Sequence, residues 1–571
     1  MRAVQRLALI PLENLSGDAS LDWIGPLSSV VLHSQTQGAV DLFTYQAASS
    51  NESFQQRPTR LLRGYYTRAG NNLHLSATLS DSISLKTLES FSRSGPMQQG
   101  PLPLLDGLAR QLWPQAKPFS TRNAQAVQAM GEGLASGNLP SSIAHLRRAI
   151  ELDPAFGEAY LSLIPALSAS GQQEEGLHLL RQALAAKVNP VAHARLQWMQ
   201  ATAARLPEMQ LSAAGTLVRL LPADAEVLGQ LATLHMTRRQ YGQAVALYRK
   251  ALLADPSWPD LWNQAAYTEV RAGNTGAGIA NLNKYASLVP TGANPLDSAG
   301  EIYFMTGRFK EAEQSFLDAY QKQPTFMAGV TLRKAAEARR MQGDLAGADA
   351  LFTRYADSSA SQPGFALARA HWEFTSGRKK KAMDLLRELA AKPGASPQLV
   401  SAALAQLSVW LLDAGDRAAA HQTAQQAMQT SAGGLAAMCL FVTDTETSAS
   451  EWTLRAEKVF AHPSGAAIKR LALAYALLFN RHFREASLVL KTSYDQIHPN
   501  NEDHVKELLA WSYAEQNRWK EASPLLGLFP LPRSAGEEIF DCLVFPRGIA
   551  LRAKALGRAD LTVLYKKLVG G

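Results

Sequence analysis

Residues 225–256 read AEVLGQLATLHMTRRQYGQAVALYRKALLADP, and the pattern returns as DLWNQAAYTEVRAGNTGAGIANLNKYASLVP at 260–290 and NPLDSAGEIYFMTGRFKEAEQSFLDAYQKQP at 294–324. Each segment has two apolar stretches at helical spacing, separated by a short polar turn. The proline that ends each segment recurs every 34 residues, at 222, 256, 290 and 324. A period of this length predicts stacked helical hairpins, since one hairpin cannot bury its apolar face alone.

Small and large residues occupy fixed positions within this repeat. With the closing proline at position 32, Gly300 falls at position 8 and Ala312 at position 20, where small residues let two helices approach closely. Trp262 at position 4 and Phe316 at position 24 are large and fill the gap to the next hairpin. Proline ends the second helix because it lacks an amide donor. The pattern resembles the tetratricopeptide repeat, which implies a mainly α fold that binds proteins and does not catalyse.

The repeats predict the organisation of most of the 571 residues. The 34-residue step is clear up to about Pro393 and blurred after it. We therefore predict a tetratricopeptide-type α-solenoid over residues 123–431, a long loop at 432–450, and further hairpins with capping helices at 451–571.

The first 95 residues have a different periodicity, typical of short strands with one helix. A small α/β domain is predicted there, followed by a linker with a packing helix at 96–122. The loop Ala69-Gly70-Asn71-Asn72 suits a hairpin because Gly and Asn tolerate positive φ. We expect a helix at 21–35 and strands at 6–12, 40–44, 60–67, 73–81 and 85–91.

Two segments of this domain carry a second resemblance. LALIPLENLSGDASLDWIGPLSSVVL (7–32) and LLRGYYTRAGNNLHLSATLSDSISLKTLESF (61–91) look like the TolB N-terminal-like domain of bacterial regulator-, cyclase- and kinase-associated proteins. Leu12 stands where that family usually has Phe. The resemblance covers about 90 residues and implies a non-catalytic domain that commonly precedes tetratricopeptide repeats, and a bacterial source.

Charge and cysteine content argue against several other classes of protein. The net charge of +8 is small for a chain of 571 residues, and the densest basic run, 378–381, falls in a predicted turn. We therefore do not expect nucleic acid as a partner. Cys439 and Cys542 lie far apart in apolar surroundings, which favours two buried thiols. No apolar stretch is long enough to span a membrane.

Candidate catalytic patterns are each better explained by the repeats. Ser376-Gly377-Arg378-Lys379 matches S-x-x-K but spans a turn between helices, and the glycine-rich segment 273–278 lacks the Gly-Lys-Ser/Thr of a phosphate loop. The histidines are scattered without metal-ligand spacing. We predict no enzyme activity, no cofactor and no metal site.

The first helix of each hairpin should line the concave face, with repeat positions 2, 5, 9 and 12 exposed there. In the three best repeats these positions carry carboxylates interleaved with aromatic or apolar residues, so we expect a basic or amphipathic protein or peptide as the partner. An ordinary solvated face would explain the same residues. The candidates for partner binding are Glu226, Asp260, Asn263, Tyr267, Asp297, Glu301 and Phe304.

Two functional readings stay open from the sequence. The first is a protein-interaction scaffold. The alternative is the sensor or regulatory half of a larger bacterial signalling protein, whose kinase, cyclase or transcription-regulator output domain lies outside this chain. The expected location is the cytoplasm by default, since no signal peptide is visible, or the periplasm if the chain is part of a membrane-anchored protein.

Overall fold

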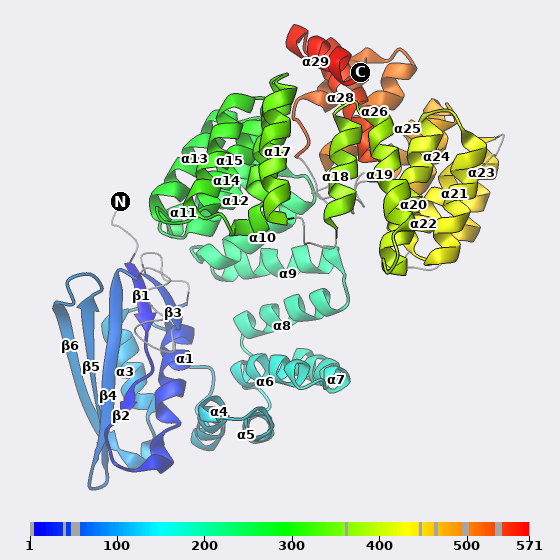
Figure 1. Ribbon diagram of the computed structural model, residues 1–571. Coiled ribbons are helices and arrows are strands. Elements are labelled where there is room, and N and C mark those ends of the chain that lie inside the picture. Colours follow the sequence, from blue (N-terminus) through cyan, green and yellow to red (C-terminus); the bar gives the residue numbers. More distant parts are fainter. Residues whose placement is uncertain are drawn as a thin grey trace. The chain divides into compact units, whose positions relative to one another are not determined.

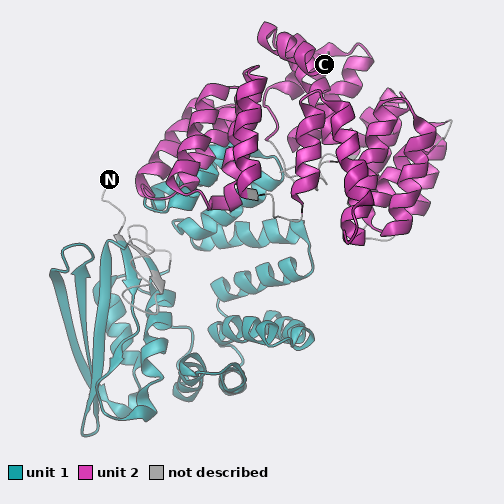
Figure 2. Ribbon diagram, in the orientation of Figure 1, with its two compact units in different colours: residues 1–268 teal, residues 269–571 magenta. Residues whose placement is uncertain are grey.

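The computed structural model describes residues 5–37, 42–46, 58–359, 364–444, 448–461, 466–493, 502–531 and 539–569. They form two compact units, 1–268 and 269–571, and the division lies within one helix (Figure 2). Among the described residues, strands occur only in the first hundred, and helices dominate the rest (Figure 1). The predicted fold class, a mainly α chain with a small N-terminal α/β domain, is confirmed.

A mixed sheet forms the N-terminal domain, with the strand order β3-β1-β4-β5-β6 and β2 beside β4. Strand β1 is parallel to β3 and β4, whereas β4, β5 and β6 are antiparallel. Gly70 forms the tip of the β4–β5 hairpin with φ +57°, in the predicted loop. Residues 40 and 41 of one predicted strand lie outside the described residues. The strands are β1 (Gln5–Leu9), β2 (Glu13–Asn14), β3 (Leu42–Gln46), β4 (Arg60–Ala69), β5 (Asn72–Asp81) and β6 (Thr87–Pro96).

Two helices, α1 (Ile24–Thr36) and α3 (Leu102–Leu112), pack against each other and against this sheet. Helix α3 lies in the segment predicted as a linker with a packing helix, and its leucines join the core of the domain. That core continues into the first helical hairpin. A Cβ on Gly131 would lie 2.5 Å from the ring of Trp23, so only glycine permits this close approach.

Helical hairpins make up the rest of the first unit, and the helices between residues 124 and 254 each pack against the next one in sequence. Leu261 and Ala265 of the following helix share a core with residues 225–252. Apolar residues at helical spacing place a buried stripe on each helix. The helices are α4 (Ala124–Ala135), α5 (Leu139–Leu152), α6 (Gly157–Ala169), α7 (Gln173–Ala185), α8 (Pro190–Ala203), α9 (Pro207–Leu220), α10 (Ala225–Thr237), α11 (Tyr241–Ala254) and α12 (Pro259–Arg271), within which the division between the units falls.

The second unit continues with hairpins of the same kind. Short 3-10 helices, η3 (Phe326–Gly329) and η7 (Ser523–Leu526), interrupt the α-helices. The α-helices are α13 (Thr275–Leu288), α14 (Asn294–Met305), α15 (Phe309–Lys322), α16 (Val330–Met341), α17 (Leu345–Ser359), α18 (Phe365–Thr375), α19 (Lys379–Ala391), α20 (Pro397–Asp413), α21 (Arg417–Thr430), α22 (Gly434–Thr443), α23 (Ala449–Val459), α24 (Ala466–Phe479), α25 (Phe483–Ser493), α26 (Glu502–Glu515), α27 (Trp519–Ala522), α28 (Asp541–Ala555) and α29 (Ala559–Val569).

The predicted repeat positions behave as the 34-residue pattern requires. A Cβ on Gly300 would lie 2.5 Å from ring atoms of Phe316, so the small residue at position 8 makes room for the large one at position 24. The closing prolines 222, 256, 290 and 324 each follow the end of a second helix, α9, α11, α13 or α15, by two residues. The helix boundaries therefore follow from the period in this part of the chain.

The loop predicted at 432–450 differs in the structure, where helix α22 spans Gly434–Thr443. Its sequence LAAMCLFVT is almost entirely apolar, and Cys439 and Phe441 are buried in the core of the second unit. Burial of this face stabilises a helix despite the two preceding glycines. Both cysteines are buried and free, as predicted.

The C-terminal helices of the second unit pack against the first helices of its repeats. The amide of Phe529 donates to the carbonyl of Met305 in α14 at 2.8 Å, and its ring packs edge-on against Phe309 at 5.0 Å. Farther along, Trp410 in α20 donates to the thiol of Cys542 in α28 at 2.9 Å. Since the first helices carry the inner face of a repeat array, the chain covers part of that face in this unit with its own C-terminal segment.

Candidate functional site

Four of the predicted binding residues lie in the first unit. Glu226 on α10 and Asp260 on α12 are exposed, whereas Asn263 and Tyr267 on α12 are partly buried. The Asn263 Oδ1 atom is buried and has no hydrogen-bond partner among the described residues. Glu226 interacts electrostatically with Arg195 of α8. Partner binding by these four residues stays a prediction.

The other three predicted residues lie in the second unit, and the structure brings two of them together. Lys334 of α16 contacts Asp297 at 2.8 Å and Glu301 at 2.6 Å. Asp297 and Lys334 are buried, with side chains 6% and 7% exposed. Burial opposes the charge on Lys334, but Glu301 and Asp297 outweigh it and raise its pKa. Phe304 is buried beside Phe309, so this group is an internal ion-pair cluster beside an aromatic core.

A groove in the first unit lies between the α/β domain and the inner faces of the first repeats. It has a volume of about 470 Å³. Helix α1 lines one side, and helices α4, α6 and α8 with the end of α9 line the other. We call it the α1 groove. Its partly exposed apolar residues are Val30, Leu134, Leu161, Val191 and Leu220.

Glu158 on α6 fixes the geometry of the α1 groove. It accepts a hydrogen bond from Ser34 of α1 at 2.9 Å and from Asn189, the N-cap residue of α8, at 3.3 Å. Ser120, before α4, donates to its second oxygen. One carboxylate therefore ties the α/β domain to two repeats, and its charge is largely satisfied within the protein.

Two cations line the α1 groove. Lys117 is exposed and Arg195 is partly exposed, and neither forms an ion pair with the residues that the structure describes. Asp224 and Glu226 interact with Arg195 at longer range. The groove thus combines an apolar lining with two cations, and the carboxylates of Asp224 and Glu226 interact with one of these cations from outside the lining, which suits an amphipathic segment.

His33 lines the same groove from α1 and contacts Thr44 through Nδ1 at 3.0 Å. Burial, together with the charge of Arg195, lowers its pKa to about 4. The imidazole is therefore neutral at physiological pH and adds no third cation to the groove.

The pKa of His33 predicts a specific loss of stability in acid. The unfolded chain binds a proton at this residue near pH 6.5, whereas the folded chain does so only near pH 4, so stability falls as pH drops through this window. Between pH 8 and pH 5 the loss from His33 is about 2 kcal/mol. Chemical denaturation should show this pH dependence reduced by that amount in His33→Gln. Equal slopes for the two proteins would contradict the prediction.

The repeat period also predicts residues of the α1 groove, which lie in repeats upstream of the three best ones. The residues 34 and 68 positions before Glu226 are Ala192 and Glu158, and those before Gly229 are Arg195 and Leu161. All four upstream residues line the α1 groove. The concave-face rule therefore applies to the earlier repeats, although their sequences match the pattern less well.

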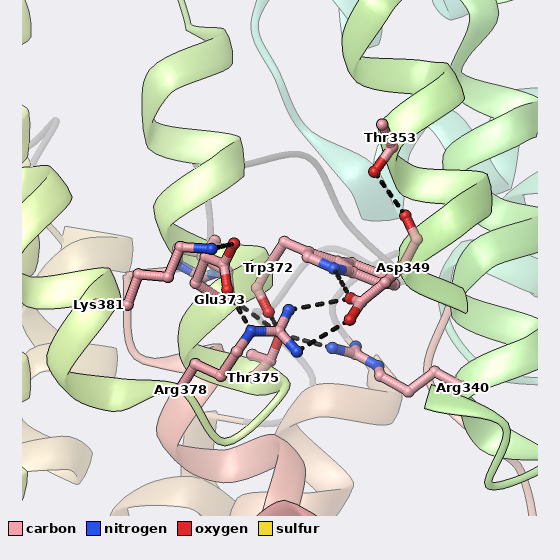
Figure 3. A network of polar contacts seen from close by, with 9 residues as sticks. Arg340, Asp349, Thr353, Trp372, Glu373, Thr375, Arg378 and Lys381 are labelled. Atoms are coloured by element: carbon pink, nitrogen blue, oxygen red, sulfur yellow. Dashed lines mark hydrogen bonds and ion pairs between the residues drawn. The ribbon is translucent and has the colours of Figure 1, made fainter. Parts of the chain in front are cut away.

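The basic run at 378–381 is largely neutralised by neighbouring carboxylates (Figure 3). Arg378 contacts Asp349 at 2.9 Å and pairs with Glu373, which also accepts Lys381 at 2.8 Å. Lys379 contacts Asp413 at 2.9 Å. Paired cations are poor phosphate ligands, so this run locks adjacent helices together.

Metal-ligand clusters and membrane-spanning helices are both absent from the described part of the chain. There, no group of three or more His, Cys, Asp or Glu side chains is placed to hold a metal ion. Within the same residues, every helix is too short or too polar to cross a bilayer.

Comparison with known proteins defines the repeat. The stacked hairpins make the chain an α-solenoid protein. Residues 225–257 match the family model of the tetratricopeptide repeat, so the solenoid contains tetratricopeptide repeats, the class the period predicts. No curated protein matches the chain.

Several solved structures are similar over about a third of the chain. PilW, a type IV pilus biogenesis factor, has 20% identity, with 35% of this chain and 93% of PilW covered and a TM-score of 0.31. PilF of Pseudomonas aeruginosa has 16% identity, coverages of 35% and 92%, and a TM-score of 0.30. YrrB, described as a tetratricopeptide-repeat protein with an unusual peptide-binding site, has 19% identity, coverages of 29% and 87%, and a TM-score of 0.25. The TolB-like resemblance of the N-terminal domain stays a prediction.

Proposed function

We propose that this protein is a non-catalytic scaffold that binds an amphipathic segment of another protein in the α1 groove. The observation that carries the proposal is the groove itself, an accessible stretch of concave face within a tetratricopeptide array. In the second unit, by contrast, the C-terminal helices pack against the first helices of the repeats. A partner segment therefore finds more available inner surface in the first unit.

The composition of the groove supports a partner segment with both apolar and charged side chains. Apolar side chains of the segment would bury against residues such as Leu161 and Val191. An acidic residue would meet Lys117 or Arg195, and a basic residue would meet the carboxylates beside Arg195. An amphipathic helix or extended segment carries both kinds of group. The earlier candidates Glu226 and Asp260 would extend the charged contacts along the inner face.

We expect changes in the groove to weaken partner binding, whereas matched changes on helix α7, outside the groove, should not. Leu161→Glu places a charge among the apolar groove residues, and we expect recovery of the partner from source-organism extracts to fall about tenfold or more, because buried anchors dominate such interfaces. Leu177 on α7, 46% exposed, offers the control Leu177→Glu, which should retain binding. Quantitative mass spectrometry of the tagged, purified protein measures both.

A second pair of variants, in which an arginine is replaced by glutamate, distinguishes the loss of groove contacts from a general loss of folding. Arg195→Glu should weaken binding strongly but lower the melting temperature only slightly, since Arg195 forms no close ion pair among the described residues and interacts with Asp224 and Glu226 at longer range. Arg181→Glu on the exposed side of α7 is the matched control. Undiminished binding by both Leu161→Glu and Arg195→Glu would rule out the α1 groove. Failure to recover any specific partner would contradict the scaffold function itself.

A further inference from the structure

A second pocket lies inside the second unit, where the first helices of the repeats meet the C-terminal helices. Its volume is about 110 Å³. Helices α14, α16, α17 and α18 form one part of the wall, and α26, α28 and residues 530–531 form the other. Four aromatic rings contribute to the lining: Phe304, Phe352, Trp372 and Phe545.

Arg340 is buried in this wall with an incomplete set of partners. It is 3% exposed, and its guanidinium lies between the rings of Trp372 and Phe545, at 4.8 and 4.6 Å from their centroids. It donates to Thr375 at 2.6 Å, pairs with Glu337, and points into the network of Figure 3. Its Nε atom is buried and has no hydrogen-bond partner among the described residues. A buried N–H without an acceptor is rare and costly, and a bound acceptor would explain it.

Arg333 lies seven residues earlier on α16, two turns away on the same side, and also lines the pocket. It is partly exposed and forms no ion pair with the residues that the structure describes. The carboxylates of the lining are otherwise engaged: Glu337 with Arg340, Glu507 with Arg552, and Asp541 with His504 at 3.1 Å. Arg333 is therefore the lining cation that is left without a close counter-charge within the described chain.

We propose that this pocket binds a small organic monocarboxylate, whose carboxylate meets Arg333 and the Nε of Arg340 and whose short apolar part packs against the aromatic rings. Guanidinium groups are the preferred ligands of carboxylates in proteins. A cavity of about 150 Å³ admits benzene, so this smaller pocket suits an acid of few heavy atoms, such as propionate.

A phosphate dianion fits the same surroundings less well. Arg333 is the lining cation without a close counter-charge among the described residues, so it compensates one negative charge but not a second. His371 adds no further cation because burial lowers its pKa. Phosphate also has no apolar part that could pack against the aromatic rings of the lining. A single negative charge with an apolar tail matches both the electrostatics and the lining.

The position of the pocket gives the ligand a structural consequence. It would join α16 and α18 of the repeats to α26 and α28 of the C-terminal segment. A ligand that binds only this arrangement stabilises it by mass action. The concentration of a small acid would thus determine how stably the C-terminal helices pack against the repeats, independently of partner binding in the α1 groove.

Calorimetric titration of the full chain with propionate tests the proposal, with propionamide and phosphate as the comparison probes. We expect saturable one-to-one binding of propionate, and binding at least about tenfold weaker for propionamide, which lacks the charge, and for phosphate. Arg333→Met should weaken propionate binding about tenfold or more. Ala368→Leu, which fills the pocket from α18, should do the same without removing any charge.

Arg369→Met is the matched control, because this arginine is exposed on α18 and does not line the pocket. It should bind propionate as the unaltered chain does. The proposal is overturned if propionamide binds as well as propionate, if phosphate binds more tightly than propionate, if Arg333→Met leaves affinity unchanged, or if no propionate binding is measured.

Discussion

Replacing Lys334 with methionine is expected to destabilise the second unit by about 3–5 kcal/mol, because it leaves Asp297 and Glu301 without their cation. Methionine has nearly the same length, so lost packing contributes little. The cost arises from the Asp297 carboxylate, which is too buried to recover its hydration. The midpoint of denaturant unfolding of the full chain measures the change.

The double variant Lys334→Met with Asp297→Asn should recover part of this loss, because the amide needs no counter-charge. The deficit of the single variant should also shrink as pH falls, since an unpaired buried Asp297 has a raised pKa and is neutralised by a proton. As a control, Arg387→Met removes the exposed Arg387–Asp384 pair, whose side chains are 52% and 48% exposed, and should change stability by less than about 1 kcal/mol. Similar effects of the two single variants would contradict the ion-pair account.

Trp410→Ala is expected to cost about 3–5 kcal/mol and to loosen the C-terminal helices from the repeats. Trp410 is 1% exposed, stacks on Phe374 of α18 at 4.3 Å, and donates to Cys542 of α28. Its removal therefore creates a cavity at the place where α18, α20 and α28 meet. Hydrogen exchange followed by mass spectrometry should show faster exchange in α28.

Trp452→Ala is the matched control for this prediction. Trp452 is fully buried and packs against Phe441 of α22 at 5.1 Å. We expect a comparable loss of global stability but no selective increase of exchange in α28. Equal exchange in α28 for both variants would show that Trp410 has no special role in holding the C-terminal segment.

The local pattern of the sequence predicts most of the helices, and the reason is physical. The 34-residue period specifies contacts between neighbouring hairpins, such as Gly300 with Phe316, which are close in sequence and repeat along the chain. The α/β domain is likewise predicted from strand alternation and the Gly70 hairpin. The apolar segment of α22 does not follow from the local pattern, because Gly433 and Gly434 favour a loop and only burial in the core selects the helix.

Contacts between distant segments could not be predicted in this way. Lys334 and Asp297 lie 37 residues apart on different repeats, and no spacing rule links their charges. The contact of Trp410 with Cys542 joins segments 132 residues apart. The groove could be found in part from the sequence, since two 34-residue steps from Glu226 lead to Glu158. Its second side, helix α1, belongs to another domain and lies outside the repeat period.

Site-specific photo-crosslinking in the source organism tests the central claim most directly, namely that the α1 groove holds the partner segment. A photoreactive phenylalanine analogue placed at Ser162, on the groove side of α6, should crosslink to one protein through one short amphipathic peptide. The same analogue at Leu177 on α7 should give no such product. Crosslinking of the same partner from Leu177, and none from Ser162, would contradict the account.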